Sequence, residues 1–485
     1  MKKYIKLWCE SCQIVRDFFA MPNIKSAFLW GIALYILALF ALIRADIYYM
    51  DDFQHSIIDN SNANVFSRFL MTFILSDLLT FGKGTLDMSP LPQIFGICFV
   101  VASSLMLIYL IRRKFDLFGV VASLPLGLSP YFLQNLSYKF DALTMGIALF
   151  LAISPFLFQK NMRVFCAVSV VSLLCMLMCY QAANATYIIL SLYFAFFANA
   201  MNLKQRAGFL GICVANLIIA TLIYKLAIMQ PISEYIIAYT SNKMFPLDSL
   251  FSGVWANLCT YATTIFDDLK STAFIWLIAL NCVLFIVNRK ILAFVFLALG
   301  FVLSFGLFLV LEQTIFEPRA FYGFNALVAV IFISNISAES SKILRFFGIV
   351  IAVITAYFLI SFANIYGNAL KKQDEYLDFR AKLLLSDLSD AIPKGVMVDL
   401  KIYINKHPVA QRFAKKYGDI ARLIPKVAEN DWFFHWRLRH LNAPYNLENN
   451  EICAFLNENF GVELVAKNAY HTIEKSKSCY IVTIH

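Results

Sequence analysis

The stretch SAFLWGIALYILALFALIRADIYYMDDF, residues 26–53, begins with an apolar run and ends on two adjacent carboxylates, Asp51 and Asp52, followed by Phe53. The apolar part, residues 26–43, is long enough to cross the roughly 30 Å hydrocarbon core of a bilayer as a helix. An uncompensated charge at bilayer depth is costly, so acidic residues just beyond such a segment are either ordinary interface residues or part of a functional site. The role of these two carboxylates therefore bears directly on the role of the chain.

Composition places most of the chain in a membrane. Hydrophobic residues make up 60% and charged residues 15% of the 485 residues, and the mean hydropathy is +0.69, whereas soluble domains carry about 25% charged residues. Apolar runs of spanning length recur, which predicts an all-α polytopic membrane bundle of about eleven transmembrane helices. The expected spans lie near residues 26–43, 91–111, 116–133, 142–158, 164–180, 185–201, 207–228, 271–287, 291–311, 320–337 and 345–363.

The distribution of Lys and Arg predicts the orientation of the bundle, because short cytoplasmic loops retain positive charge. Basic residues precede the first span and then fall in every second connection. They are Lys2, Lys3, Lys6, Arg16, Lys25, Arg112, Arg113, Lys114, Lys160, Arg163, Lys204, Arg206, Arg289, Lys290, Lys342 and Arg345. This alternation predicts a cytoplasmic N-terminus and, with an odd number of spans, a C-terminus on the outer face. The net charge of +10 is largely this topogenic signal, and nothing in it requires a nucleic-acid partner.

The chain divides into three regions. Residues 1–25 form an amphipathic cytoplasmic lead that is expected to lie on the membrane surface. Residues 26–363 form the bundle, whose outer loop 45–90 contains a short apolar stretch around Arg68 that is expected to be an interfacial helix. Residues 364–485 are polar and are expected to form a small periplasmic α/β domain. No cleavable signal peptide is visible, so the first span is interpreted as an anchor in a bacterial inner membrane.

The polar tail has its own pattern of elements. We expect helices over residues 371–388 and 408–423 and strands over residues 395–400 and 479–484. Most cysteines lie in apolar runs, where a thiol behaves as a small hydrophobe. Cys453 and Cys479 fall instead in the tail assigned to the oxidising side of the membrane, so they are candidates for a disulfide.

Three short elements carry a family resemblance. They are YYMDD at residues 48–52, SPYFLQNLSYKFD at residues 129–141 and CYQAA at residues 179–183. In this order, and on the predicted outer side, they resemble the serotype-converting O-antigen glucosyltransferases of the Gtr type. Such proteins often have arginine where Lys139 and His55 stand here. The difference keeps a positive charge at Lys139 but leaves the role of His55 open.

The resemblance implies a membrane-embedded glycosyltransferase of the GT-C class with a catalytic carboxylate in its first outer loop. It implies transfer of a hexose, glucose above all, from an undecaprenyl-phosphate carrier to O-antigen or a related lipid-linked or polymeric glycan, with inversion. Such a reaction needs a base for the acceptor hydroxyl and positive charge for the departing phosphate. Asp51 or Asp52 is the candidate base, and the neighbouring carboxylate would raise its pKa. The alternative is that both are the hydrated end of a helix.

Other polar residues on the predicted outer side are candidates for substrate contacts. Arg319, Arg68 and Lys139 are candidates for the donor phosphate, because cations pair with phosphate oxygens and the arginine fork matches them in shape. The alternatives are interface arginines bound to lipid headgroups and an ion pair of Lys139 with Asp141 that ties two helices together. Candidates for the sugar or acceptor hydroxyls are Tyr138, Asp141 and Gln181, and the alternative for each is a contact between helices.

No cofactor is expected. The histidines lack metal-ligand spacing, so no zinc site is predicted, and Gly-rich phosphate loops are absent. The second acidic pair, Asp267 and Asp268, is interpreted as an exposed helix start rather than as a divalent-cation site shared with the first pair. The aromatic stretch at residues 432–436 is expected to pack a core or dock to the membrane rather than to stack on acceptor sugars.

Two other classes of protein share some of these features. A polysaccharide polymerase or ligase would also act outside on prenyl-linked glycans, but would tend to depend on arginines in large outer loops. A lipid-linked glycan flippase or transporter is expected to show internal repeats or matching broken helices, and neither is visible. The carboxylates of the first outer loop therefore favour the transferase.

Overall fold

Helices dominate the computed structural model, which describes residues 2–59, 66–197, 201–229, 243–425, 432–447, 461–477 and 479–485. Within these residues, five helices are long and apolar enough to cross a membrane. They are α2 (Ile24–Ala45), α6 (Leu91–Arg112), α11 (Met162–Cys179), α13 continued by η4 (Leu203–Ile228) and α19 (Lys342–Ala391). Two bent helix pairs raise the number to seven. The structure therefore confirms an α-helical membrane bundle, but it does not confirm eleven spans.

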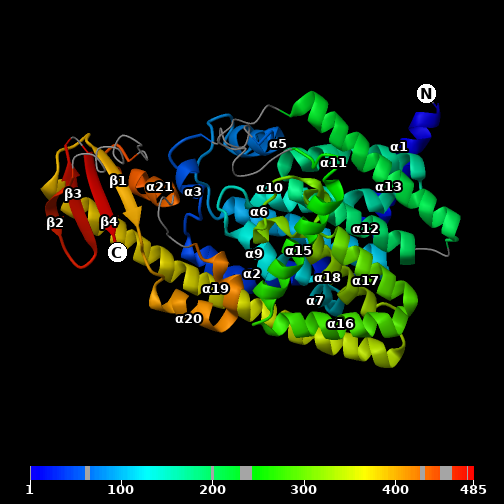
Figure 1. Cartoon of the computed structure of the whole chain (residues 1–485). Coiled ribbons are helices and arrows are strands. Elements are labelled where there is room, and N and C mark those ends of the chain that lie inside the picture. Colours follow the sequence, from blue (N-terminus) through cyan, green and yellow to red (C-terminus); the bar gives the residue numbers. More distant parts are fainter. Residues whose placement is uncertain are drawn as a thin grey trace.

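The other bundle elements are shorter. They are α1 (Lys2–Phe19), α3 (Asp52–His55), α5 (Phe69–Thr72), η1 (Phe73–Leu78), α7 (Leu117–Ser123), α8 (Pro125–Leu128), α9 (Pro130–Ser137), α10 (Ala142–Ile153), η2 (Ser154–Phe158), η3 (Gln181–Ala183), α12 (Asn184–Phe197), α15 (Leu250–Leu269), α16 (Ala273–Arg289), α17 (Ile291–Leu303), η5 (Gly306–Val310), η6 (Pro318–Ala320) and α18 (Tyr322–Asn335). In Figure 1, α1 and the C-terminal sheet lie at opposite ends of this bundle.

Proline explains why the predicted span 116–133 is not a single helix. Pro125 and Pro130 each stand at the first position of a new helix, where the missing N–H costs nothing. The chain bends by 67° between α7–α8 and α9. A second bend, of 115°, joins α15 to α16, and α15 lies in the segment predicted to be an outer loop.

Glycine allows two helices of the bundle to approach closely. A Cβ atom on Gly96 of α6 would lie 2.6 Å from the carbonyl oxygen of Ala142, and one on Gly146 of α10 would lie 2.7 Å from the carbonyl oxygen of Gly96. Small residues permit such contact between helix backbones in membranes. The crossing fixes the start of α10, where Asp141 is located.

Helix α19 connects the bundle to the tail. It runs unbroken for 50 residues, so the predicted span 345–363 and the predicted tail helix 371–388 are parts of one helix. Its first half packs along α2 in the bundle, and its last turns lie against the C-terminal sheet (Figure 1). Leu377, Leu384 and Leu388 of this end are buried in the core of the tail.

The tail is a small α/β domain, as predicted. Its sheet has the order β1-β4-β3-β2, from β1 (Met397–Ile402), β2 (Glu463–Lys467), β3 (His471–Ser476) and β4 (Cys479–Ile484). Strands β1 and β4 are parallel and the other pairs are antiparallel. The domain also contains α20 (Pro408–Tyr417), η7 (Gly418–Leu423) and α21 (Trp432–His440). Cys479 is disulfide-bonded, and its predicted partner Cys453 lies outside the described residues.

Candidate functional site

The two carboxylates follow the end of α2. The helix stops at Ala45, Asp46 adopts a left-handed conformation with φ 49°, and α3 begins at Asp52. Met50, directly before the pair, also has positive φ, 53°. Left-handed backbone is uncommon for residues other than glycine and persists where the surrounding structure holds it. Adjacent in sequence, Asp51 and Asp52 therefore leave this turn in different directions and meet different surroundings.

Asp52 is fully buried and binds backbone amides. Its Oδ2 atom accepts hydrogen bonds from the N–H groups of Tyr49 at 2.8 Å and Lys139 at 2.9 Å, and its Oδ1 atom accepts one from Phe140 at 3.5 Å. Burial raises the pKa of the Asp52 carboxyl well above its usual range. Because these contacts fix the first loop to the turn between α9 and α10, Asp52 acts as an anchor.

Asp51 is only partly buried. Its Oδ1 atom has no hydrogen-bond partner among the described residues. A carboxylate oxygen without a protein donor can accept a proton or a hydrogen bond from a ligand. Of the two predicted candidates for the base, Asp51 therefore has a shielded carboxylate oxygen that no described protein donor occupies.

Asp141 is a buried carboxylate that interacts electrostatically with Asp51. It is the N-cap of α10, yet its side chain does not cap the helix, and its Oδ1 atom has no partner among the described residues. Burial, together with the charge of Asp51, raises the pKa of Asp141 to about 6, although the charges of His55, Arg68 and Arg319 oppose this shift. The carboxylate of Asp141 thus interacts electrostatically with the candidate base and with both arginines that are candidates for the donor phosphate.

Arg68 and Gln181 form a connected pair. The Nε atom of Arg68 donates to Oε1 of Gln181 at 3.0 Å, and its guanidinium lies over the ring of Tyr180 at 4.8 Å. The side-chain amide of Gln181 donates to the carbonyl of Phe66 at 3.0 Å and to the hydroxyl of Tyr224 at 2.9 Å. Gln181 therefore orients Arg68, and its predicted contact with a sugar stays a prediction.

Arg319 and Tyr138 form the second pair. Arg319 belongs to η6, where its backbone N–H donates to Oε1 of Gln134 at 2.8 Å and its guanidinium donates to the hydroxyl of Tyr138. The ring of Tyr138 packs edge-on against Tyr49 with a centroid distance of 4.9 Å. These contacts bring the end of η6 against the segment that carries Asp51.

Lys139 does not join the arginines. Its buried ammonium pairs with Asp46 at 2.8 Å and with Asp87 at 3.3 Å, and it lies 4.0 Å from the ring centroid of Tyr48. Both carboxylates belong to the same loop as Asp51. Lys139 is thus held in ion pairs, as the alternative interpretation expected, but its partners are Asp46 and Asp87 instead of Asp141.

Sequence reasoning left His55 without a role. It is buried, its Nδ1 atom has no partner among the described residues, and its ring packs edge-on against Phe140 at 5.7 Å. His55 is four positions after Asp51, one turn along the chain, and this spacing was the available signal. Its charge acts on Asp141.

The second acidic pair is not an exposed helix start. Asp268 is buried near the C-terminal end of α15, where both of its oxygens accept from Arg422 of η7, at 2.9 and 2.8 Å. Asp267 pairs with Lys270 at 2.7 Å. In the part of the chain that the structure describes, no three His, Cys, Asp or Glu side chains are grouped as metal ligands.

The aromatic stretch of the tail packs a core, which was the favoured prediction. Phe433 and Phe434 of α21 are buried among residues of the sheet and of α19, while Trp432 is exposed. Later residues of the same helix contact α3. The stretch is therefore a structural joint between the tail and the first loop.

Comparison with known proteins covers the region of the chain that contains these residues. The family model of the GtrII glucosyl transferases matches residues 39–330, which include Asp51, Arg68, Asp141 and Arg319. An uncharacterized 55.3 kDa protein in the gtrB 5' region of Salmonella phage P22 is 27% identical over 240 residues, 47% of this chain and 48% of that protein. The aligned part thus spans about half the length of this relative. No solved structure matches. The matched family region covers more than half of the chain, and the chain belongs to the GtrII glucosyltransferase family.

Proposed function

We propose that this membrane protein transfers glucose from an undecaprenyl-phosphate carrier to O-antigen or a related surface glycan, at the periplasmic face of a bacterial inner membrane. The observation that carries the proposal is the position of Asp51. Its unpartnered oxygen lies at the end of a membrane helix, and its charge acts on the same buried carboxylate, Asp141, as those of Arg68 and Arg319. The alternating Lys and Arg residues of the loops support the orientation.

The proposed step is a single displacement with inversion. Asp51 takes the proton of the acceptor hydroxyl while the acceptor oxygen forms a bond to C1 of the sugar. The bond between C1 and the phosphate oxygen breaks, and the carrier phosphate leaves with the bonding electrons. Arg68 and Arg319 stabilise the negative charge that develops on this phosphate. Asp141, whose carboxylate interacts with the charges of both arginines, and Tyr138, whose hydroxyl accepts from Arg319, are the candidate contacts for sugar hydroxyls. The step as written needs no metal ion or redox cofactor.

The membrane edge suits this chemistry. A polyprenyl chain confines the donor to the bilayer, while a water-soluble glycan approaches from the aqueous side. A base in the first loop, just beyond the end of α2, can reach the sugar carbon while the prenyl chain remains in lipid. Holding the reactants in this way supplies much of the rate gain of a two-substrate reaction.

The test is expression of the chain in cells that make polyprenyl-phosphate glucose and a defined surface glycan, followed by structural analysis of the glycan. We expect one added glucosyl branch with the wild-type chain and none with Asp51→Asn. Asp59→Asn is the matched control, since the Asp59 carboxylate accepts from the N–H of Thr85. A change in glycan chain length, or loss of surface display without new branches, would contradict the proposal.

A further inference from the structure

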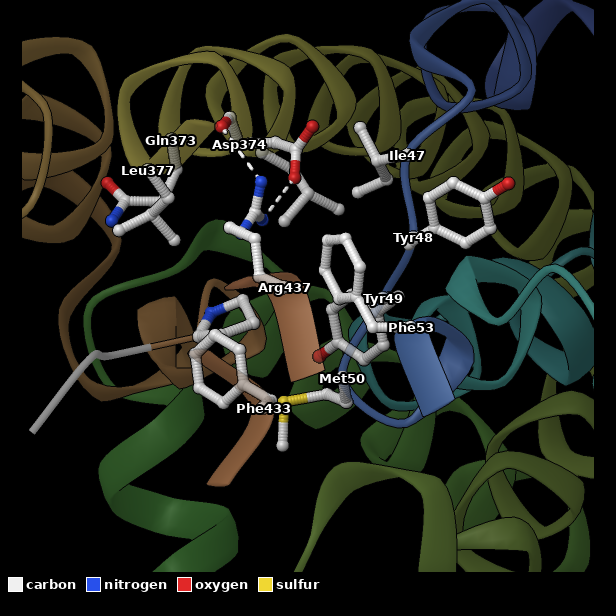
Figure 2. A pocket seen from close by; sticks show the side chains of 12 residues that line it. Ile47, Tyr48, Tyr49, Met50, Phe53, Gln373, Asp374, Leu377, Phe433 and Arg437 are labelled. Atoms are coloured by element: carbon white, nitrogen blue, oxygen red, sulfur yellow. Dashed lines mark hydrogen bonds and ion pairs between the residues drawn. The ribbon is translucent and has the colours of Figure 1, made fainter. Parts of the chain in front are cut away.

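One basic residue of the tail domain contacts the first loop, which carries Asp51 and Asp52. Arg437 of α21 is buried, with 3% of its side chain exposed, and it ion-pairs with Asp374 at 2.5 Å and Asp378 at 2.9 Å, both on α19. Its guanidinium carbon also lies 4.4 Å from the ring centroid of Phe53, which follows Asp51 and Asp52. Figure 2 shows Arg437 between the carboxylate of Asp374 and the ring of Phe53. One side chain thus joins α19, α21 and α3.

A second residue of α21 contacts the same loop. The ring of His440 lies 4.8 Å from that of Tyr48 and 5.7 Å from that of Phe53, and its Nδ1 atom is 2.9 Å from the hydroxyl of Ser56. These three contacts lie on both sides of Asp51 in the sequence. The tail therefore holds the loop before and after the candidate base.

A third contact comes from the chain before α21. The hydroxyl of Tyr49 donates to the carbonyl oxygen of Leu423, in η7, at 2.8 Å, and it also accepts from Gln134 at 3.2 Å. Asp52 anchors the loop to the bundle from the other side. The segment of residues 48–56 is thus held between the bundle and the tail.

The backbone of this segment needs such support. Met50 has φ 53°, and a small pocket beneath it is lined by Tyr48, Met50, Phe53 and Arg437 (Figure 2). A left-handed non-glycine residue is maintained only if its neighbours fix the conformation. Because Met50 directly precedes Asp51, relaxation of its backbone would change the direction of the Asp51 carboxylate.

We propose that Arg437 is a positioning residue for the transfer reaction, through which the C-terminal domain holds residues 48–56 so that Asp51 faces the glycosyl donor. The inference rests on the proposed function for the role of Asp51. The contacts between Arg437 and Phe53 can be tested without it. In this arrangement the tail domain is part of the catalytic apparatus, because it fixes the position of Asp51.

The first test changes Arg437 in the purified full-length protein. We expect Arg437→Ala to lower kcat on the order of 10- to 100-fold with little change in KM, because a small misplacement of a catalytic group has effects of this size. Arg437→Lys should restore part of kcat, since it keeps a charge for Asp374 and Asp378. Arg439→Ala is the matched control, because Arg439 lies on the same helix over the ring of Trp436 and should leave kcat unchanged.

A second variant separates positioning from folding of the tail. Phe53→Leu removes the ring over which Arg437 lies but retains the ion pairs of Arg437 with α19, so the tail should remain folded while kcat falls. Hydrogen exchange of residues 48–56 provides a readout without activity, and it should increase in Arg437→Ala and Phe53→Leu but not in Arg439→Ala. Unchanged exchange and kcat in Phe53→Leu would overturn the inference. Increased exchange in Arg437→Ala and Phe53→Leu, with no transfer by the wild-type chain, would instead reject only the proposed function.

Discussion

Replacement of Asp52 should damage the structure of the site more than replacement of Asp51. The Asp52 carboxylate is fully buried and accepts two short hydrogen bonds, from the N–H groups of Tyr49 and Lys139. In Asp52→Ala both N–H groups are left buried without a partner. Among the described residues, Oδ1 of Asp51 has no hydrogen-bond partner, so Asp51→Asn loses no hydrogen bond at this atom. The two variants should therefore separate stability from chemistry.

The magnitude follows from the two orphaned amides. A buried N–H group left unsatisfied costs about 1–3 kcal/mol, so Asp52→Ala should lower the free energy of unfolding by about 2–6 kcal/mol. The third contact, to Phe140, is 3.5 Å long and adds little. Asp52→Asn keeps one oxygen for these donors and removes the buried charge, so its cost should be much smaller. Asp51→Asn should leave stability unchanged and reduce transfer about 10²- to 10⁴-fold, the usual contribution of a general base.

The dependence on pH gives an independent check of the same anchor. Burial raises the pKa of Asp52 in the folded protein above its value of about 3.9 in the unfolded chain. The folded state therefore binds the proton more tightly, and this group's contribution to stability is present at low pH and is lost as the pH rises through the folded pKa. Asp52→Asn should remove this part of the pH dependence.

The measurements are thermal unfolding in detergent from pH 4 upward, hydrogen exchange of residues 45–56, and transfer activity for each variant. We expect faster exchange and a lower melting temperature in Asp52→Ala, with Asp52→Asn close to wild type. The reasoning is refuted if Asp52→Ala melts with the wild type, or if Asp52→Asn abolishes transfer while Asp51→Asn retains it. The second result would exchange the roles of the two carboxylates.

Three further predictions concern charges around the site. Burial raises the pKa of Asp141 to about 6, so, if its ionised form assists transfer, kcat/KM should increase as the pH rises through about 6, and Asp141→Asn should flatten that limb of the profile. Arg68→Ala should raise the KM for the polyprenyl-phosphate donor roughly tenfold or more through loss of a charged hydrogen bond, and a donor titration with unchanged KM would exclude Arg68 from the phosphate site. Arg422→Ala leaves Asp268 buried and unpaired and should destabilise the docked tail by about 3–5 kcal/mol, whereas the double variant with Asp268→Asn should recover part of the melting temperature.

Local signals predicted the elements whose causes are local. The strand expected at residues 479–484 is β4, and the helix expected to start on Pro408 is α20, because a short run of apolar and β-branched residues and a first-turn proline act within a few residues. Hydropathy also identified α2 and α6 as spans. It predicted one span where Pro125 and Pro130 each begin a new helix, because average hydropathy does not detect a bend.

The candidate site was predictable in its location but not in its assignment of roles. Asp51 and Asp52 have the same chemistry and are adjacent, so no sequence pattern separates them. What separates them is the amide of Lys139, 87 positions away, which binds only Asp52. The same holds for Asp268, whose burial depends on Arg422, a residue of another domain.

The basic residues predicted to bind the donor phosphate show why long-range pairing decides the role of a charge. Lys139 and Arg68 were predicted for the same phosphate, since each is a basic residue on the predicted outer side. In the fold, Lys139 is held by the carboxylates of Asp46 and Asp87, whereas Arg68 is held by the neutral amide of Gln181 and the ring of Tyr180. A cation between two carboxylates presents little net positive charge to a phosphate, but a cation oriented by neutral groups keeps its full charge. For this reason the donor phosphate should bind at Arg68, and Lys139 should serve to fix the loop that carries Asp51.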